Sequence, residues 1–352
     1  NADPIHYAHM LPGVQTNSEY KAGINIQGCE NSHNAILIEG VPIYNANHLL
    51  GLFSVFNASH FSTMGIDKTC PVSYGTNCIG GVLSMQYDDE IPQSFEGDVS
   101  VGLISSQGSF CLPIGKRTKV TLSLRASYLN LLYGAWLEND EMRLGYSFAD
   151  ANFTFLHKLD SCPSFIIDYY GGYDRGQFNE YEDAVKLNST WGNQVGAFHW
   201  RFNGVKYKIN TTLYTTNYSN NMSLDMSGID ANLPSSISDV GVKSFMKAKT
   251  WNVGANVIYH HISPQKVDIK SIYDITHVPP KNQDTWEATL HGEYKYGFMR
   301  NFSANVGAKL IGYFTSHRNF FHVDPSVSLQ YDNQTTRVSL NYSYGHQYLF
   351  QT

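Results

Sequence analysis

The chain has 352 residues, of which 15% are charged and 14% aromatic, with a formal net charge of −6. The acidic balance and the lack of basic runs exclude nucleic acid as a main partner. The aromatic content excludes an unfolded chain. Because no run approaches about 18 apolar residues, a membrane-spanning helix is excluded as well. The remaining classes are a water-soluble all-β protein and an outer-membrane β-barrel, whose strands average a lipid face and a wet face.

The first 90 residues predict a small, loop-rich α+β unit. A stretch of helical or irregular character, 48–61, interrupts its strands. We place a domain boundary here, with domains over 1–90 and 91–352. The predicted strands are short apolar segments bounded by Gly and Asn, at 23–27, 35–39, 65–68 and 81–86.

From about residue 95 onward, apolar and polar residues alternate with a period of two, which indicates strands with one face of each kind. Val120 and Leu122, for example, face away from Thr121 and Ser123. The alternation recurs in about 13 segments. Most are roughly ten residues or longer, whereas strands of soluble proteins typically have about five to six.

The predicted strands are joined by connections of two lengths. Short turns at one end and long loops at the other are typical of transmembrane barrels. Because such barrels have an even number of strands and lipid does not tolerate an open edge, the odd count predicts an antiparallel β-barrel that is incomplete here. The turns fall at 158–163, 202–206 and 332–336, and the predicted loops at 131–147, 179–190, 219–236 and 263–282.

Five cysteines, Cys29, Cys70, Cys78, Cys111 and Cys162, are irregularly spaced. No CxxC pair occurs, so they do not indicate a zinc or redox site. Cys70 and Cys78 are close enough for a bridge across a short turn, and the sequence leaves open whether they form one. Since no signal peptide stands at Asn1, we expect a processed or omitted N-terminus.

Four segments of the first domain resemble, in order and spacing, the plug domain of TonB-dependent outer-membrane transporters: DPIHYAHMLPGVQ (3–15), GINIQG (23–28), NAILIEGVPIYNANHLLGLFSVFN (34–57) and DKTCPVSYGTNCIGGVLSMQ (67–86). Three later segments are more loosely similar to the family's barrel: 101–110, 122–132 and 191–203. The resemblance implies an all-β membrane protein of the Gram-negative outer membrane. In it the α+β plug sits inside a barrel that usually has 22 strands, with the C-terminal strands missing here.

The resemblance implies TonB-dependent active import of a bulky nutrient. Ligand would bind between the plug apex and the extracellular loops, and TonB would pull on a segment that precedes Asn1. The implied partners are TonB, the lipid bilayer, a surface lipoprotein and an extracellular ligand such as a glycan, siderophore, cobalamin or peptide; no cofactor is implied. The alternatives are a non-transporting outer-membrane receptor or component of a surface complex, and a soluble secreted β-sandwich.

The loop YNANH (44–48) corresponds to the outward apex of the family's plugs and supplies four candidate ligand contacts: Tyr44, Asn45, Asn47 and His48. Stacking plus hydrogen bonding suits neutral polar ligands such as sugars. The same side chains can instead satisfy the backbone of the turn. Gln27, at a neighbouring apex, and Trp136, near a loop end, are further candidates, although a girdle at the membrane interface also explains Trp136.

Two positions depart from the family pattern. Gln27 replaces the arginine of an Ile-Arg-Gly motif, and Ser73, before Tyr74, replaces that of Arg-Tyr-Gly. Those arginines normally pair with barrel glutamates through a bidentate, charge-assisted contact that Gln and Ser cannot make. We therefore expect Gln27, Ser73 and Tyr74 to face polar groups of the barrel and neutral hydrogen bonds to hold the plug. An unpaired barrel glutamate beside them would contradict this.

The sequence does not indicate catalysis or a metal site. Neither a nucleophile elbow nor an HExxH motif occurs, so we expect no enzymatic activity. His260 and His261 are adjacent in an alternating segment. They therefore point to opposite faces of their strand, and no metal site is expected there.

Overall fold

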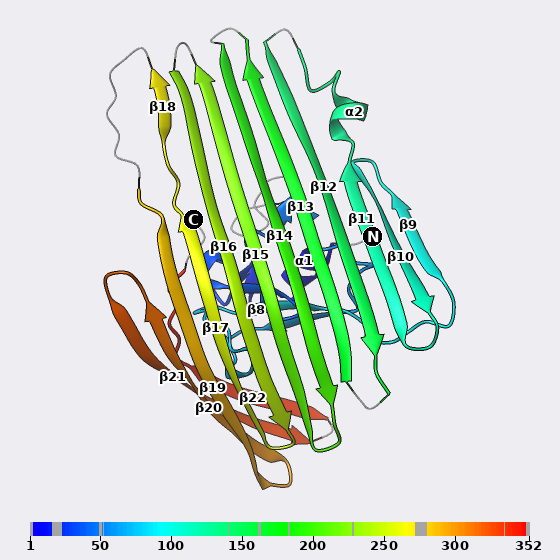
Figure 1. The fold of residues 1–352 in the computed structure, drawn as a ribbon, viewed down its shortest axis with the longest axis vertical. Coiled ribbons are helices and arrows are strands. Elements are labelled where there is room, and N and C mark those ends of the chain that lie inside the picture. Colours follow the sequence, from blue (N-terminus) through cyan, green and yellow to red (C-terminus); the bar gives the residue numbers. More distant parts are fainter. Residues whose placement is uncertain are drawn as a thin grey trace.

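One large antiparallel sheet, the wall, curves around a small N-terminal unit formed by residues 3–87 (Figure 1). Among the described residues no helix has the length and apolar character to cross a bilayer. The structure is a computed structural model and describes residues 3–15, 23–48, 51, 53–139, 141–160, 163–181, 184–226, 229–271, 280–333 and 335–349.

The N-terminal unit is built on a four-stranded sheet in the order β4-β3-β8-β7, in which β3 and β8 are parallel. Its first helix, which the sequence reading did not predict, begins where Asp3 accepts a hydrogen bond from the Ile5 N–H (2.9 Å). The elements are α1 (Pro4–His9), β1 (Val14–Gln15), β2 (Asn25–Ile26), η1 (Asn31–His33), β3 (Ala35–Ile38), β4 (Val41–Pro42), β5 (Asn47–His48), β6 (Phe53–Ser54), β7 (Thr63–Asp67), η3 (Val72–Tyr74) and β8 (Val82–Gln86).

The wall contains 14 strands, and neighbours along its path pair antiparallel from β9 to β22. The short β18 lies off this path and continues the ladder of β17 along β16. A short helix, α2 (Leu129–Tyr133), follows β11. The strands are β9 (Glu96–Val101), β10 (Ser105–Ile114), β11 (Thr118–Ser127), β12 (Met142–Lys158), β13 (Pro163–Glu180), β14 (Val185–Asn203), β15 (Tyr207–Met226), β16 (Ile229–Ala248), β17 (Trp251–Ser263), β18 (Asp268–Ser271), β19 (Gln283–Met299), β20 (Phe302–Phe314), β21 (Asn319–Asn333) and β22 (Thr336–Ser343).

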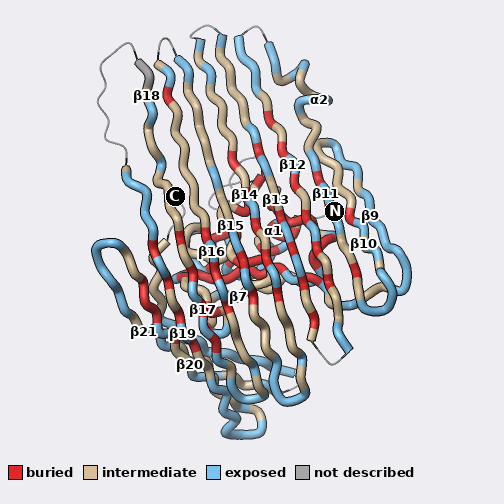
Figure 2. The backbone as a smooth tube through the Cα atoms, in the orientation of Figure 1, coloured by how far each residue is buried: buried red, intermediate tan, exposed pale blue. Residues whose placement is uncertain are grey.

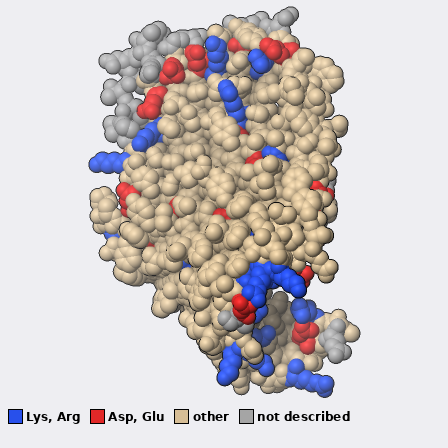
Figure 3. Space-filling model, turned by 45° about the vertical axis from the view of Figure 1, so that its right-hand side comes forward, with Lys and Arg blue, Asp and Glu red and all other residues tan. Residues whose placement is uncertain are grey.

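In its middle section the wall is apolar outside and polar inside, as the alternation predicts. The register aligns an outward row across six strands: Phe155, Ile167, Phe198, Leu213, Val242 and Val257. Five of these six are exposed, as expected of side chains that face lipid. On the inner face, buried residues gather where the strands pass the N-terminal unit (Figure 2). Figure 3 shows the outer face as a broad band with few charged residues.

The core of the N-terminal unit continues into the wall. Ile26, Ile38 and Leu83 are fully buried and belong to one cluster with Tyr170 and Val195, which project inward from β13 and β14. Burying an aliphatic or aromatic side chain contributes roughly 1.5–3 kcal/mol. Apolar packing therefore holds the unit against β13 and β14, and the polar contacts described below surround this patch.

Two of the predicted long loops are wrong. The segments 179–190 and 219–236 are paired strands, because β13 to β16 have 18 to 20 residues and meet in tight hairpins at the upper end of Figure 1. The segment 131–147 holds the end of α2 and the start of β12. Much of 263–282 lies outside the described residues. A strand needs only about 9–11 residues to cross a bilayer, so these strands extend well beyond it.

Candidate functional site: the contact between the N-terminal unit and the wall

Tyr44 points into the wall. Its hydroxyl donates to Asp239 Oδ2 (2.5 Å), and Asp239 Oδ1 lies 2.8 Å from His260 Nδ1. Burial, reinforced by Asp239, holds the pKa of Tyr44 well above its usual value, so it remains a donor. His261, by contrast, is partly exposed and lies 2.7 Å from Asp284. The two histidines point to opposite faces, as the alternation predicts.

Asn45 and Asn47 also bind the wall. Asn45 adopts a positive φ of 44° and donates from Nδ2 to the Tyr218 hydroxyl (3.0 Å), while its carbonyl accepts from Asn193 (3.2 Å). The carbonyl of Asn47 accepts from Trp191 Nε1 (3.4 Å). These backbone and amide contacts fix the YNANH loop to β14 and β15.

His48 lies between two carboxylates and is 1% exposed. Its Nδ1 is 2.7 Å from Asp174, its Nε2 is 3.1 Å from Asp150, and its ring stacks on Phe148 at 4.5 Å. Burial alone lowers the pKa of His48, but the hydrogen bonds to both aspartates outweigh it and raise the pKa above its ordinary value. The pair of carboxylates thus favours the imidazolium form, in which both ring nitrogens donate.

A wall arginine completes this cluster. Arg125 binds Asp150 (2.7 and 2.8 Å) and donates to the carbonyl of Ser54 in the N-terminal unit (2.7 Å). Its guanidinium also lies 5.3 Å from the centre of the Phe148 ring. The predicted ligand contacts Tyr44, Asn45 and His48 therefore engage the wall.

A second ionic contact lies lower in the interface. Arg201 pairs with Glu39 and with Asp89 (2.9 and 3.1 Å), and Lys243 donates to the carbonyl of Gly40 (2.8 Å). The expectation that neutral hydrogen bonds alone hold the unit is therefore wrong. The charges are reversed relative to the family's pattern, because here the wall supplies the cations and the N-terminal unit supplies the acceptors.

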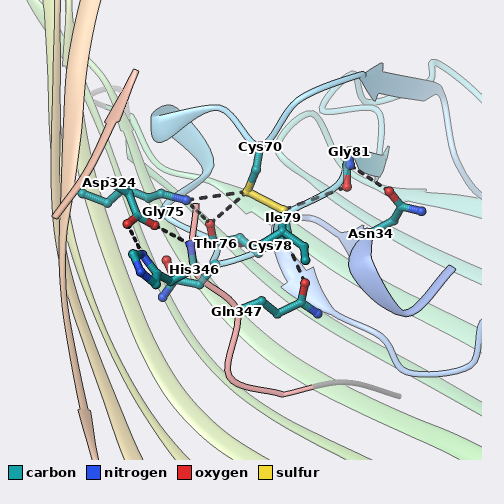
Figure 4. The surroundings of a disulfide bond; sticks show 12 residues. Asn34, Cys70, Gly75, Thr76, Cys78, Ile79, Gly81, Asp324, His346 and Gln347 are labelled. Atoms are coloured by element: carbon teal, nitrogen blue, oxygen red, sulfur yellow. Dashed lines mark hydrogen bonds and ion pairs between the residues drawn. A yellow bond between two sulfur atoms is a disulfide. The ribbon is translucent and has the colours of Figure 1, made fainter. Parts of the chain in front are cut away.

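A disulfide joins Cys70 to Cys78 and closes the loop 70–78, which is inserted against the wall (Figure 4). Three consecutive residues of the loop bind wall side chains. Gly75 accepts at its carbonyl from Asn256, Thr76 accepts from Lys309 (2.9 Å), and Asn77 donates to Glu287 (2.7 Å) and Thr289 (2.9 Å). The bridge that the sequence left open thus closes a docking loop.

The three residues expected to face the barrel at the lost arginine positions lie elsewhere. Ser73 and Tyr74 line a cavity of about 870 Å³ between the unit and the wall, and Lys247 and Glu293 line it too. Burial raises the pKa of Tyr74 to about 12. Gln27 is exposed in a turn at φ 55°, where its N–H donates to Gly13 (2.7 Å). Within the described residues, no hydrogen bond joins these three side chains to the wall.

Trp136 lies at the upper rim. It is 83% exposed and lies just after α2, with its ring 5.7 Å from that of Tyr133. The sequence reading missed the wall cations Arg125, Arg201 and Lys309. Each lies in the polar phase of an alternating strand, and a cation in a lumen-facing phase was the available signal.

His60 joins the N-terminal unit to two wall hydroxyls. Its Nδ1 is 2.7 Å from Ser123 and its Nε2 is 2.9 Å from Thr154. Since Ser123 donates to Ser109 (2.6 Å), the neutral ring donates to Ser123 and accepts from Thr154. Burial, with a smaller contribution from Lys119, lowers the pKa of His60 to about 3.

Acidification is therefore expected to destabilise the folded protein through His60. Its pKa is about 3 folded against 6.5 unfolded, so its contribution, on the order of 4 kcal/mol, is complete above pH 6.5 and is lost as the pH falls towards 3. His60→Gln retains the hydrogen bonds without titrating and should flatten the pH dependence of the urea midpoint. Identical pH profiles for the two proteins would contradict this assignment.

Comparison with known proteins identifies the fold. No protein-family model and no curated protein matches the chain. Solved structures do match. The ferric-catecholate import receptor Fiu from E. coli K12, in its closed form, has a TM-score of 0.65 at 12% identity, covering 93% of this chain and 60% of that one.

Two further receptors are similar. The alcaligin outer-membrane receptor FauA from Bordetella pertussis has a TM-score of 0.61 at 12% identity, covering 97% of this chain and 59% of its own. The outer-membrane ferripyoverdine receptor of Pseudomonas aeruginosa has 0.66 at 9%, covering 94% and 53%. The chain thus has the fold of outer-membrane siderophore receptors and spans between half and two thirds of their length.

Proposed function

We propose that this chain is the plug and part of the barrel of a TonB-dependent transporter in the outer membrane of a Gram-negative bacterium. The fold shared with import receptors and the sequence resemblance support this proposal. The apolar outer row of the wall fits a bilayer. The N-terminal unit is the plug, and its removal or rearrangement opens the path for a bulky nutrient.

The division of the interface into separate polar contacts is the observation that carries the proposal. The His48 cluster, the Arg201 pair and the loop 70–78 each join the plug to different wall strands. Small contacts of this kind can be broken one after another by a force applied to the plug's N-terminal side. The outer membrane has no ATP, so the work has to come mechanically from TonB.

Growth on the transported nutrient, in a strain that expresses the full-length protein, is expected to disappear when tonB is deleted. The assay is uptake of labelled nutrient from a panel of glycans, ferric siderophores, cobalamin and peptides, compared in the two backgrounds. Surface binding should remain in the deletion strain, because binding does not need energy. Uptake that persists without TonB, or binding without any uptake in either strain, favours a non-transporting receptor and refutes the proposal.

A further inference from the structure

Above the plug, the polarity of the wall is reversed. The residues that contact the plug, such as Asp174, Trp191 and Tyr218, mark the inner face. Strands β12 to β16 pair without a register shift up to their hairpins. Every second residue therefore keeps the same face, and the inner face can be followed along each strand beyond the plug.

The inner face carries a continuous apolar row across six strands, each residue opposite the next in the register: Leu144, Phe178, Leu187, Leu224, Ala231 and Ile269. The outer face at the same level is polar, and its row reads Arg143, Asn179, Lys186, Asp225 and Asp230. In the middle section, by contrast, the apolar row is outside. The upper section therefore turns its apolar side chains into the lumen, which we call the vestibule.

The floor of the vestibule is aromatic. Tyr146, Phe148 and Trp191 form a buried cluster, against which Leu129 of α2 and Tyr218 of β15 pack. Between the floor and the apolar row lies a second inner row that includes Met222 and Leu233. An apolar surface of this size in water is stabilised when another apolar surface covers it.

The charge of the vestibule restricts what binds there. Among the inner-face residues of the described segments 142–146, 174–180, 185–191, 218–226 and 229–237 there is no lysine or arginine. The only charged side chains on that face are Asp174 and Glu180, and Asp174 is bound to His48. Carboxylates without partner cations at this level repel an anion, and the apolar row gives an anion nothing to replace its hydration.

We propose that the vestibule binds a ligand through an uncharged, planar apolar part, seated between the aromatic floor and the row from Leu144 to Ile269. The inference rests on the proposed function and narrows it, because it excludes ligands recognised mainly through negative charge. Aromatic rings on the floor stack on a planar group. The apolar row covers the remainder of the ligand.

A matched pair of dyes tests the charge and the apolar character together. N-phenyl-1-naphthylamine is neutral, and 8-anilinonaphthalene-1-sulfonate has the same two aromatic systems with a sulfonate added. Energy transfer from tryptophan is measured for the full-length protein in lipid nanodiscs, with empty nanodiscs subtracted. We expect saturable transfer to the neutral dye, with a Kd about tenfold or more below that of the sulfonate. Trp191→Phe should remove the saturable signal, and the outward-facing Trp286→Phe should keep it.

Reversing the charge of the vestibule gives the second arm. Leu187→Arg is expected to weaken the neutral dye about tenfold and to strengthen the sulfonate, whereas Asn188→Arg on the outer face of the same strand should change neither. If Leu187→Arg does not assemble, Leu224→Arg, opposite it in the row, replaces it. Tighter binding of the sulfonate to the unaltered protein, or no saturable binding of the neutral dye, overturns the inference. Either result leaves the TonB-dependence of uptake, and hence the proposed function, to be decided separately.

Discussion

Replacing Gly75 with alanine is expected to displace the loop 70–78 from the wall and to weaken the attachment of the plug by about 2–4 kcal/mol. Gly75 has a φ of 59°, which costs a residue with a side chain about 1–2 kcal/mol. A Cβ there would lie 2.6 Å from both Asn256 Nδ2 and His291 Nε2. Those buried side chains would have to move, and Asn256 would lose its hydrogen bond to the Gly75 carbonyl.

Gly115→Ala is the matched control for this substitution. Gly115 has a similar φ of 69° in the turn between β10 and β11, but a Cβ there meets nothing within 4 Å. The difference between the two variants therefore isolates crowding from backbone strain. The measurement is the urea concentration at which a protease begins to cleave the plug of the full-length protein in lipid nanodiscs. Equal shifts for the two variants would show that the docked position of Gly75 contributes nothing.

The substitution Arg201→Met is expected to weaken the plug by about 3–5 kcal/mol, because it leaves Glu39 buried without its cation. Burial already raises the pKa of Glu39 above its usual range, against the opposing effect of Arg201. Without the guanidinium the pKa of Glu39 rises further. Since a raised carboxyl pKa means that the folded state binds the proton more tightly, the deficit of the variant should shrink as the pH falls.

A second substitution tests the cause of this loss. Glu39→Gln added to Arg201→Met removes the buried charge and keeps an acceptor for the Tyr87 N–H, which now binds Glu39 at 2.6 Å. We expect the double variant to recover more than half of the loss. Arg117→Met is the control, because it breaks the exposed Arg117–Asp160 pair and should cost less than about 1 kcal/mol. A double variant as weak as Arg201→Met would exclude the unpaired carboxylate as the cause.

The middle of the wall could be predicted from the sequence because one environment acts on each face there. Lipid selects apolar residues outside and the plug selects polar ones inside, so segments such as 119–127 show a clear period of two. The upper parts of β15 and β16 alternate too, at Met222, Leu224 and Leu233. Their apolar phase is shifted by one residue relative to the lower part. That shift interrupts the pattern, and the segments resembled loops.

The candidate site could be predicted only in part. The resemblance located the YNANH loop at an interface, but not which side of it His48 would face. That depends on Asp150 and Asp174, which are about 100 residues or more away in sequence and meet His48 only through the register of β12 and β13. The reversed polarity of the charged contacts was likewise hidden, because the loss of an arginine at position 27 does not show that Arg201 has taken over an ionic role.

The bridge between Cys70 and Cys78 has a mechanical consequence. When tension is applied from the N-terminal side of the plug, the force that reaches Cys70 passes directly to Cys78, so the residues between them do not extend. Without the bridge, the eight-residue separation would add roughly 27 Å of slack, and the attachments of Gly75, Thr76 and Asn77 would peel away one at a time. With it, these attachments are loaded in parallel and sheared together, which makes the loop the anchor expected to yield last and abruptly.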